Sequence, residues 1–345
     1  MKGQNLETNF DKKAIKKGLI TTLSISVGII LTIIFFTFGP KTLKVLYKIN
    51  FLYLFFSVSI LIISWYVESI RINATIKAIT YKNINLTLNE GVQLYLASAF
   101  LSGVTPFTSG GWPLQIYYLT TKGLTLGEAT MVPAVRSLVK TIMFGALSPF
   151  LFIIFKKELN TYYKFPDYLI YIGLFLSILL IIGFLLVARY PYVTRKILIK
   201  VLLFRWVRNK KFLRKFIILT VRELINFQLS GKILVEKWFY VLWIALLTVI
   251  FWIIQFAIPI LILKGLSGSV PIKEMIVAQI ILNFIVPFSP TPGGSGAAEL
   301  GFAGIFSPFV SGYLLGAFTT LWRFVTFYIT LIAGGIYFSK MLRKF

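Results

Sequence analysis

Two short motifs rich in glycine and proline contain the residue types best suited to bind an anion. The first reads Thr-Pro-Phe-Thr-Ser-Gly-Gly at 105–111, and the second reads Ser-Pro-Thr-Pro-Gly-Gly-Ser-Gly at 289–296. Glycine lets a phosphate approach the backbone closely, and a helix that begins after such a turn points unpaired N–H groups and a positive dipole end at it. The threonine and serine hydroxyls add hydrogen-bond donors. Together the motifs predict a site for a phosphate or carboxylate group.

An arginine follows each motif at nearly the same distance. Arg136 lies 31 residues after Thr105, and Arg323 lies 32 residues after Thr291, each within a long apolar segment. A charged side chain at the centre of a membrane helix costs about 2.5–3.5 kcal/mol on insertion scales, so each arginine should face a polar cavity, a partner or a headgroup. We therefore predict a site for an anionic lipid headgroup. Its predicted residues are Thr105, Thr108, Ser109, Gly110, Gly111, Gln115, Arg136, Thr291, Gly293, Gly294, Ser295, Gly296, Glu299 and Arg323.

Acidic partners for the two arginines are unevenly distributed in the sequence. Glu299 follows the second motif by three residues, whereas the first motif has no acid beside it. We expect Arg323 to be mainly structural and paired with Glu299, and Arg136 to be the freer charge. The alternative is that these charges form structural ion pairs that hold the two halves together. Glu68 and Arg71 are expected to pair with each other at the inner end of a helix.

The composition defines the class of protein. Of 345 residues 57% are hydrophobic and 14% are charged, and the formal net charge is +25, with a mean hydropathy of +0.84. These values indicate a polytopic membrane protein. Cys and His are absent, which excludes disulfides, Cys/His metal or haem sites, catalytic thiols and Ser-His-Asp triads, so we expect no cofactor. Apolar runs separate the basic segments, so anionic lipid, and not nucleic acid, is the expected partner.

Six apolar segments are long enough to cross a hydrocarbon core of roughly 30 Å. They are Gly18–Phe38, Phe51–Ile70, Ala129–Phe155, Tyr168–Ala188, Trp238–Leu263 and Gly312–Phe338. Two further segments, 91–104 and 276–289, are too short to span, and each runs into one of the glycine-rich breaks. Two short limbs around a break predict re-entrant hairpins at about 91–121 and 276–306. The alternative in each place is one long, kinked spanning helix.

The order of these segments predicts an inverted repeat. The first membrane repeat covers 1–167 and the second covers 168–345, with the hairpins entering from opposite sides of the membrane. Lys and Arg are concentrated at both termini and in a basic insertion at 189–237, which places all three in the cytoplasm. The insertion has the pattern of an amphipathic helix. It is expected either to lie on the anionic leaflet or to pack on the inner end of the helix bundle.

The motifs resemble a known family. Residues 109–119, Ser-Gly-Gly-Trp-Pro-Leu-Gln-Ile-Tyr-Tyr-Leu, and 290–299, Pro-Thr-Pro-Gly-Gly-Ser-Gly-Ala-Ala-Glu, are similar to the lysylphosphatidylglycerol synthase transmembrane (flippase-like) family. This family includes the membrane half of bacterial multiple peptide resistance factors. The resemblance implies a lipid-translocating domain in the plasma membrane of a prokaryote. In the resistance factors this domain moves aminoacylated phosphatidylglycerol to the outer leaflet, which repels cationic peptides.

The sequence departs from that family in two places. The resistance factors continue into a soluble aminoacyl-transferase domain, whereas this sequence stops at Phe345, so lysyl transfer by this chain is not expected. Many relatives carry Gly-Glu with a nearby Arg in the first motif. Here Gly110, Gly111, Trp112, Pro113 and Gln115 stand instead, so a symmetric pair of acids is not expected.

We predict that the chain moves an anionic or aminoacylated phospholipid, or another lipid phosphate, between leaflets through a polar cavity between the repeats. Two alternatives stay open: a membrane-embedded lipid-modifying transferase with Glu299 as base, and a membrane partner of a separate synthase. The lack of His and of an Asp-rich metal motif leaves little chemistry for an enzyme, so a transporter is preferred. Homo-oligomers are compatible with all three functions.

Overall fold

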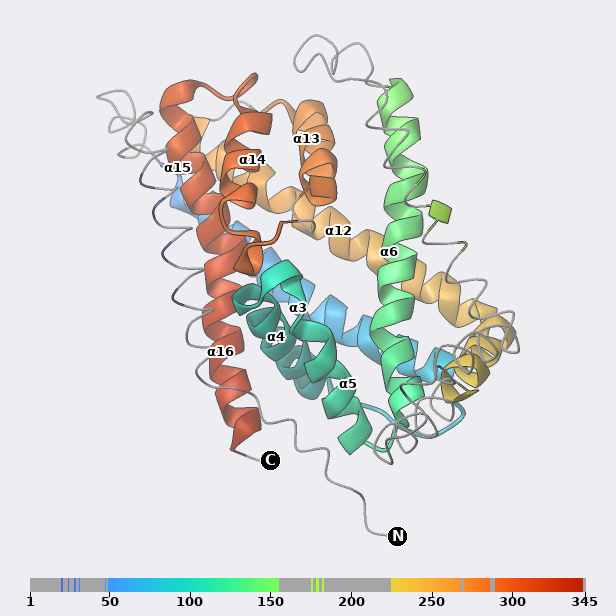
Figure 1. Cartoon of the computed structure of the whole chain (residues 1–345). Helices are drawn as coiled ribbons and strands as arrows, with labels where there is room; N and C mark the ends of the chain where they lie inside the picture. The colour runs from blue at the N-terminus through green and yellow to red at the C-terminus, as the bar shows by residue number, and fades with distance from the viewer. Residues whose placement is uncertain are drawn as a thin grey trace, which may run out of the picture.

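The computed structural model describes residues 49–154, 225–267, 270–285 and 289–343, together with single helical positions within 20–47 and 175–182. The regular structure of the described residues is entirely helical (Figure 1). The predicted spans Gly18–Phe38 and Tyr168–Ala188, and residues 189–224 of the basic insertion, lie outside the described ranges.

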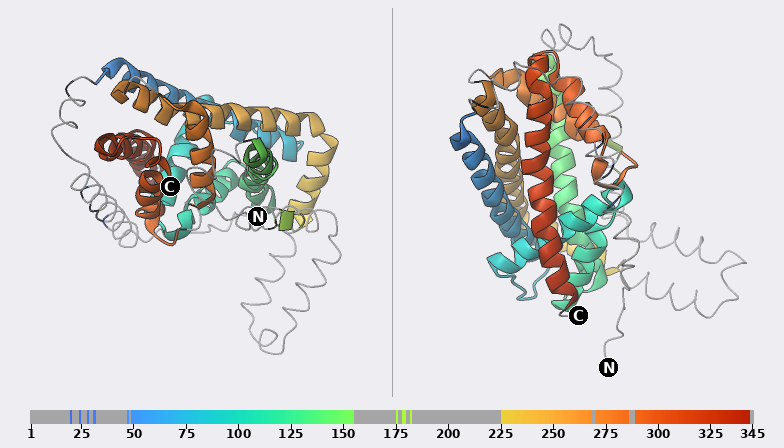
Figure 2. Two further views of the ribbon diagram at one scale, coloured as in Figure 1. Left: turned by 90° about the horizontal axis from the view of Figure 1, so that it is seen from above. Right: turned by 90° about the vertical axis from the view of Figure 1, so that its left-hand side faces the viewer.

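Long helices form where the other four spans are predicted. They are α3 Phe51–Ile79, α6 Leu126–Ile154, α12 Trp238–Ser267, and a run that comprises α15 Gly312–Arg323, the π-helical turn η4 Phe324–Tyr328 and α16 Ile329–Leu342. Helix α3, helix α12 and the α15–α16 run are long and apolar enough to cross a bilayer. Helices α3 and α12 pack side by side along their length (Figures 1 and 2). An all-helical fold with three apolar helical segments long enough to span is thus confirmed for the described residues, and the count of six spans stays a prediction.

Two helical hairpins form at the glycine-rich breaks. The first comprises α4 Leu88–Val104, the 3₁₀ turn η1 Pro106–Thr108 and α5 Gly111–Thr121, and the second comprises α13 Ile272–Ile285, the 3₁₀ turn η3 Pro292–Gly294 and α14 Ala297–Phe306. In each, the two limbs pack against each other, so neither is one long kinked helix. Figure 1 shows α4 and α5 in the lower half of the molecule and α13 and α14 in the upper half. The tips η1 and η3 contact each other between them. Whether the hairpins are re-entrant in the bilayer stays a prediction.

Polar contacts close the open end of the first hairpin. The hydroxyl of Thr87 accepts a hydrogen bond from the backbone N–H of Glu90, and the Glu90 carboxylate accepts one from the backbone N–H of Thr87. This capping box fixes the start of α4. The ammonium of Lys122, just past α5, pairs with the Glu90 carboxylate and lowers its pKa. The limbs are therefore joined at the base as well as at the tip.

The two tips share one backbone conformation. Phe107 has φ 53° and ψ 23°, and its counterpart Gly293 has φ 61° and ψ 14°. The next residues, Thr108 and Gly294, are also left-handed, with φ of 52° and 66°. Left-handed backbone costs about 1–2 kcal/mol for a residue with a Cβ and little for glycine. The motif match in the sequence therefore reflects a real structural match, and the first tip is the strained one.

The end of the basic insertion packs on the protein. Residues 225–236 are helical, and Leu234 is buried in the same apolar core as the end of α3. Lys237 donates hydrogen bonds of 2.8 Å to the backbone carbonyls of Lys77 and Thr80, and Tyr81 donates one of 2.6 Å to Glu236. This part of the insertion follows the alternative of packing on the bundle. Contact of the remainder with anionic lipid stays a prediction.

A first prediction concerns the close contact of the two tips. A Cβ placed on Gly293 would lie 2.7 Å from the carbonyl oxygen of Gly103 and 2.7 Å from the ring of Phe327, in addition to the left-handed φ. We expect Gly293→Ala to lower the free energy of unfolding by roughly 1–3 kcal/mol. Gly304→Ala is the matched control, because a Cβ there meets nothing within 4 Å. Thermal unfolding of the purified variants measures both, and equal melting temperatures would contradict the contact.

A second prediction concerns topology. Thr121 at the end of α5 and Ser307 after α14 are exposed at the open ends of the two hairpins. Because the native chain has no cysteine, Thr121→Cys and Ser307→Cys each introduce a single thiol. We expect a membrane-impermeant maleimide to label Thr121→Cys from the cytoplasm and Ser307→Cys from outside. Labelling of both from one side would show that the hairpins do not enter from opposite sides.

Candidate anion-binding site

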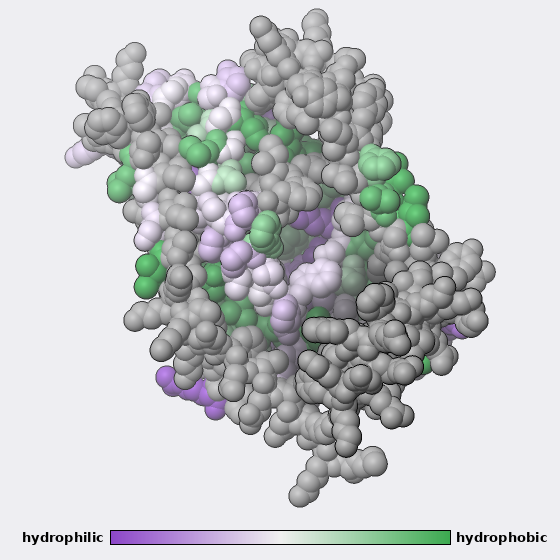
Figure 3. Space-filling model, in the orientation of Figure 1, coloured by the Kyte–Doolittle hydropathy of each residue, from purple (hydrophilic) through white to green (hydrophobic). Residues whose placement is uncertain are grey.

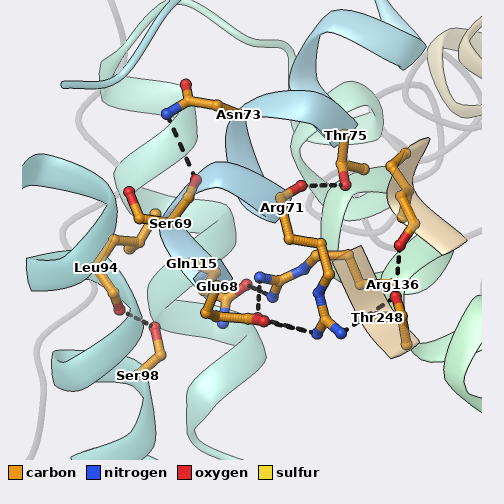
Figure 4. A network of polar contacts seen from close by, with 11 residues as sticks. Glu68, Ser69, Arg71, Asn73, Thr75, Leu94, Ser98, Gln115, Arg136 and Thr248 are labelled. Atoms are coloured by element: carbon orange, nitrogen blue, oxygen red, sulfur yellow. Dashed lines mark hydrogen bonds and ion pairs between the residues drawn. The ribbon is translucent and has the colours of Figure 1, made fainter. Parts of the chain in front are cut away.

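Three charged side chains meet in the interior below the tips. Glu68 and Arg71 come from the middle of α3, and Arg136 comes from α6 (Figure 4). Arg136 Nη1 lies 2.6 Å from Glu68 Oε1, and Arg71 Nη2 lies 2.9 Å from Glu68 Oε2. Their exposed fractions are 3% for Glu68, 8% for Arg71 and 6% for Arg136. One buried carboxylate is therefore shared by two buried guanidinium groups.

Neutral groups complete the cluster. Gln115 from α5 accepts a hydrogen bond of 2.6 Å from Arg136 Nη2, and Thr248 from α12 accepts one of 3.3 Å from Arg71 Nη1. The Nε atoms of both arginines are buried without an acceptor. The ammonium of Lys140, one turn beyond Arg136, lies 4.8 Å from the ring centre of Trp252 and has no carboxylate partner among the described residues. The cluster thus has more positive charge and more donors than its acceptors balance.

This arrangement corrects two expectations from the sequence. Glu68 and Arg71 do pair, but they do not lie at a helix end, because α3 continues to Ile79 and not to residue 70. Arg136 was expected to be the freer charge, without a nearby acid, but it pairs with Glu68. The acid is missing from the first motif because α3, which crosses α6, supplies it from 68 residues away in the sequence. Neighbourhood in sequence could not reveal it.

A second charged group fixes the second tip. Arg323 Nε lies 2.9 Å from Glu299 Oε1, which confirms the predicted pair. Arg323 Nη2 also donates a hydrogen bond of 2.9 Å to the carbonyl of Gly293, and its guanidinium stacks 3.8 Å from the ring centre of Phe327. Glu299, with 0% exposure, accepts a hydrogen bond of 2.7 Å from the N–H of Gly296. Charge is balanced here, one to one, and the group clamps η3 to α14 and α15.

A cavity of about 420 Å³ opens beside the first cluster. Five predicted site residues line it, namely Thr108, Gly111, Gln115, Arg136 and Gly293. Helix α5 begins at Gly111, and no side chain caps its first turn. Its positive dipole end and unpaired N–H groups therefore adjoin the same cavity as Arg136. Figure 3 shows hydrophilic side chains within a hollow near the centre of this face.

The other predicted residues do not line this cavity. They are Thr105, Ser109, Gly110, Thr291, Gly294, Ser295, Gly296, Glu299 and Arg323. Several of their hydroxyls hold the breaks together instead. Thr105 Oγ1 donates to the carbonyl of Leu101 and accepts from the N–H of Gly110, and Thr291 Oγ1 donates to the carbonyl of Ser295. These hydroxyls satisfy the backbone groups that each break leaves unpaired.

Besides Glu68, five polar residues on the cavity wall were not predicted from the sequence. They are Tyr95, Ser98 and Ser102 on α4, and Thr326 and Thr330 near the π-helical turn. Their signal was present, because each set recurs at three or four residues and so falls on one helix face. A π-helical turn widens the backbone and is common at functional sites.

A second cavity of about 270 Å³ adjoins the first. Tyr95, Thr326 and Thr330 line both cavities. The second is bounded further by aromatic and amide side chains of α12 and α13. These are Phe251, Trp252, Gln255, Phe256, Gln279 and Asn283.

Comparison with known proteins places the chain in a family context. The family described as the lysylphosphatidylglycerol synthase TM region matches residues 22–334. A UPF0104 membrane protein from Archaeoglobus fulgidus is 25% identical over 323 residues, which cover 93% of this chain and 96% of that protein.

A third prediction compares the two arginines. Arg323→Ala would leave Glu299 buried without its cation, and breaking a buried pair costs about 3–5 kcal/mol of unfolding free energy. Arg136→Ala would leave Glu68 paired with Arg71. The free energy of unfolding should therefore fall clearly less in Arg136→Ala than in Arg323→Ala. Denaturant or thermal unfolding of both variants in detergent measures the difference. A larger loss for Arg136→Ala would show that the first cluster, and not the second, holds the fold together.

Proposed function

The chain belongs to the lysylphosphatidylglycerol synthase transmembrane-region family, and from this premise we propose that it moves an anionic lipid between membrane leaflets. The route is the cavity at Arg136, with the lipid phosphate held there during passage. The host membrane is the plasma membrane of a prokaryote, with both termini in the cytoplasm. In this proposal the two hairpins belong to inverted repeats and bring their tips together at mid-membrane.

The excess of positive charge beside a polar cavity carries the proposal. Arg71 and Arg136 share the single carboxylate of Glu68, and Arg136 lines the cavity. A phosphate about 4 Å from an unbalanced guanidinium gains roughly 4 kcal/mol at an effective dielectric of about 20. An anion also supplies the acceptors that the cluster lacks. A lipid phosphate that leaves water can recover part of its hydration energy here.

The surrounding residues position the arginine for this task. Glu68 fixes one nitrogen of the Arg136 guanidinium and Gln115 fixes another, so the side chain is held in one orientation. The start of α5 adds N–H donors and the positive end of its dipole. Tyr95 and Ser102 offer hydroxyls along α4, whereas the Ser98 hydroxyl donates to the backbone carbonyl of Leu94. The site therefore has the donors that a phosphate needs without a second acid that would repel it.

The transferase alternative receives no support from the geometry of Glu299. Its carboxylate is fully buried, pairs with Arg323, accepts the N–H of Gly296 and lines neither cavity. A general base must reach the proton that it removes. No observation favours a partnership with a separate synthase over independent action.

A fourth prediction tests the role of Arg136 in liposomes. Arg136→Ala should reduce the translocation of fluorescent phosphatidylglycerol roughly tenfold or more, because charge-assisted hydrogen bonds contribute about 1.5–3 kcal/mol. Arg136→Lys should restore part of the rate, since an ammonium lacks the bidentate fork that matches a phosphate.

Arg343→Ala, an exposed arginine after α16, is the matched control and should move lipid at the native rate. Each variant is first shown to be folded by its melting temperature. Translocation at the native rate by a folded Arg136→Ala variant would show that Arg136 takes no part in lipid translocation.

A further inference from the structure

The second cavity carries an inference about which lipid the chain accepts. It adjoins the Arg136 cavity through Tyr95, Thr326 and Thr330, so one headgroup can extend from one cavity into the other. Its volume of about 270 Å³ suits part of a headgroup and not a whole lipid. Unlike the first cavity, it has no charged side chain among the described residues that line it.

The orientation of three amide side chains defines the chemistry of this cavity. Gln279 Nε2 donates to the backbone carbonyls of Phe256 and Met275, at 3.1 and 3.2 Å. Asn283 Nδ2 donates to the backbone carbonyl of Gln279 at 2.9 Å. Exchanging oxygen for nitrogen in either amide would place two acceptors face to face, so the carbonyl acceptors settle the assignment.

Gln255 follows the same rule. Its Nε2 donates to Ser64 Oγ at 3.3 Å, and that hydroxyl already donates to the carbonyl of Leu61. Gln279 therefore uses both of its N–H groups within the protein, and Asn283 and Gln255 use at least one each. Among the described residues no donor reaches their side-chain oxygens. The three side-chain oxygens are neutral acceptors, and Trp252 Nε1 on the same lining is a buried donor without an acceptor among the described residues, so the cavity suits a ligand group that both donates and accepts hydrogen bonds.

The charges around the cavity decide between a hydroxyl and an ammonium donor. Arg71 lies 5.2 Å from the ring centre of Phe251, and Lys140 lies 4.8 Å from that of Trp252. Both rings line the cavity, and each already has a cation over one of its faces. No described carboxylate lines it. A further ammonium would be repelled by like charge, whereas hydroxyl groups would not.

We propose that the second cavity is a subsite for a neutral, hydroxyl-bearing headgroup, a polyol or a sugar, attached to the phosphate held at Arg136. This assignment rests on the proposed function and narrows it. The substrate class is a lipid phosphodiester with a hydroxylated headgroup. An aminoacylated lipid, with its ammonium group, is rejected.

Binding of short-chain lipids to the purified full chain tests the subsite without relying on transport. Dioctanoyl phosphatidylglycerol and dioctanoyl phosphatidylethanol have the same phosphodiester charge, and the glycerol headgroup has two more hydroxyls and one more carbon. We expect the glycerol lipid to bind about fivefold more tightly, from the ligand dependence of the melting temperature, since one neutral hydrogen bond changes affinity by about that factor. Dioctanoyl lysylphosphatidylglycerol should bind more weakly than the glycerol lipid.

Two substitutions at Asn283 separate the subsite from general packing. Asn283→Leu should remove the preference for the glycerol lipid and leave binding of the ethanol lipid unchanged. Asn283→Asp places a carboxylate in the cavity and should reverse the order, so that the lysyl lipid binds more tightly than the glycerol lipid. Asn85→Asp, at an exposed position that lines neither cavity, adds the same charge and should leave the native order.

The outcomes distinguish this inference from the proposed function. Equal affinity of the native protein for the glycerol and ethanol lipids, or tighter binding of the lysyl lipid, would overturn the subsite even if anionic lipid crosses liposomes. The predicted order of affinities with no movement of any lipid would uphold the subsite and overturn the translocase.

Discussion

The shared carboxylate of Glu68 is the constraint on which the interior depends. In a low dielectric it holds two arginines that would otherwise repel each other, and those arginines bind side chains of α5 and α12. One carboxylate thus ties four helices together around a cavity. Replacing Glu68 with a neutral residue would leave two buried cations, Arg71 and Arg136, without their carboxylate. The same shortage of negative charge that makes the cluster costly makes it receptive to a phosphate.

The two breaks perform different tasks with one backbone conformation. In the second, glycines adopt the left-handed turn without strain, and Arg323 and Glu299 clamp it in a buried, charge-balanced group. In the first, Phe107 and Thr108 adopt the same turn with strain, and Thr108 lies on the cavity wall. Strained backbone often marks functional segments. The backbone strain therefore lies in the first break, whereas the second break is held without strain, and both contribute to the cavity wall through Thr108 and Gly293.

Much of the fold was predictable because helix length, apolar runs and glycine breaks are local properties. The positions of α4, α13 and both tips followed from them, as did the pairing of Glu299 with Arg323 on adjacent helices. The partner of Arg136 was not predictable, because Glu68 reaches it through the crossing of α3 and α6. The amide-lined cavity was missed for the same reason. Its residues come from α3, α4, α12, α13, α15, the π-helical turn and α16, and no short stretch of sequence contains them.

We propose above all that the cavity at Arg136 recognises a lipid by its phosphate. The most direct measurement is translocation by the native chain in liposomes of two fluorescent lipids with the same acyl chains. One is phosphatidylglycerol, and the other is a neutral glycosyl diacylglycerol, which keeps the hydroxyls and lacks the phosphate. We predict that the chain moves phosphatidylglycerol much faster than the glycolipid. Equal rates, or faster movement of the glycolipid, would contradict it.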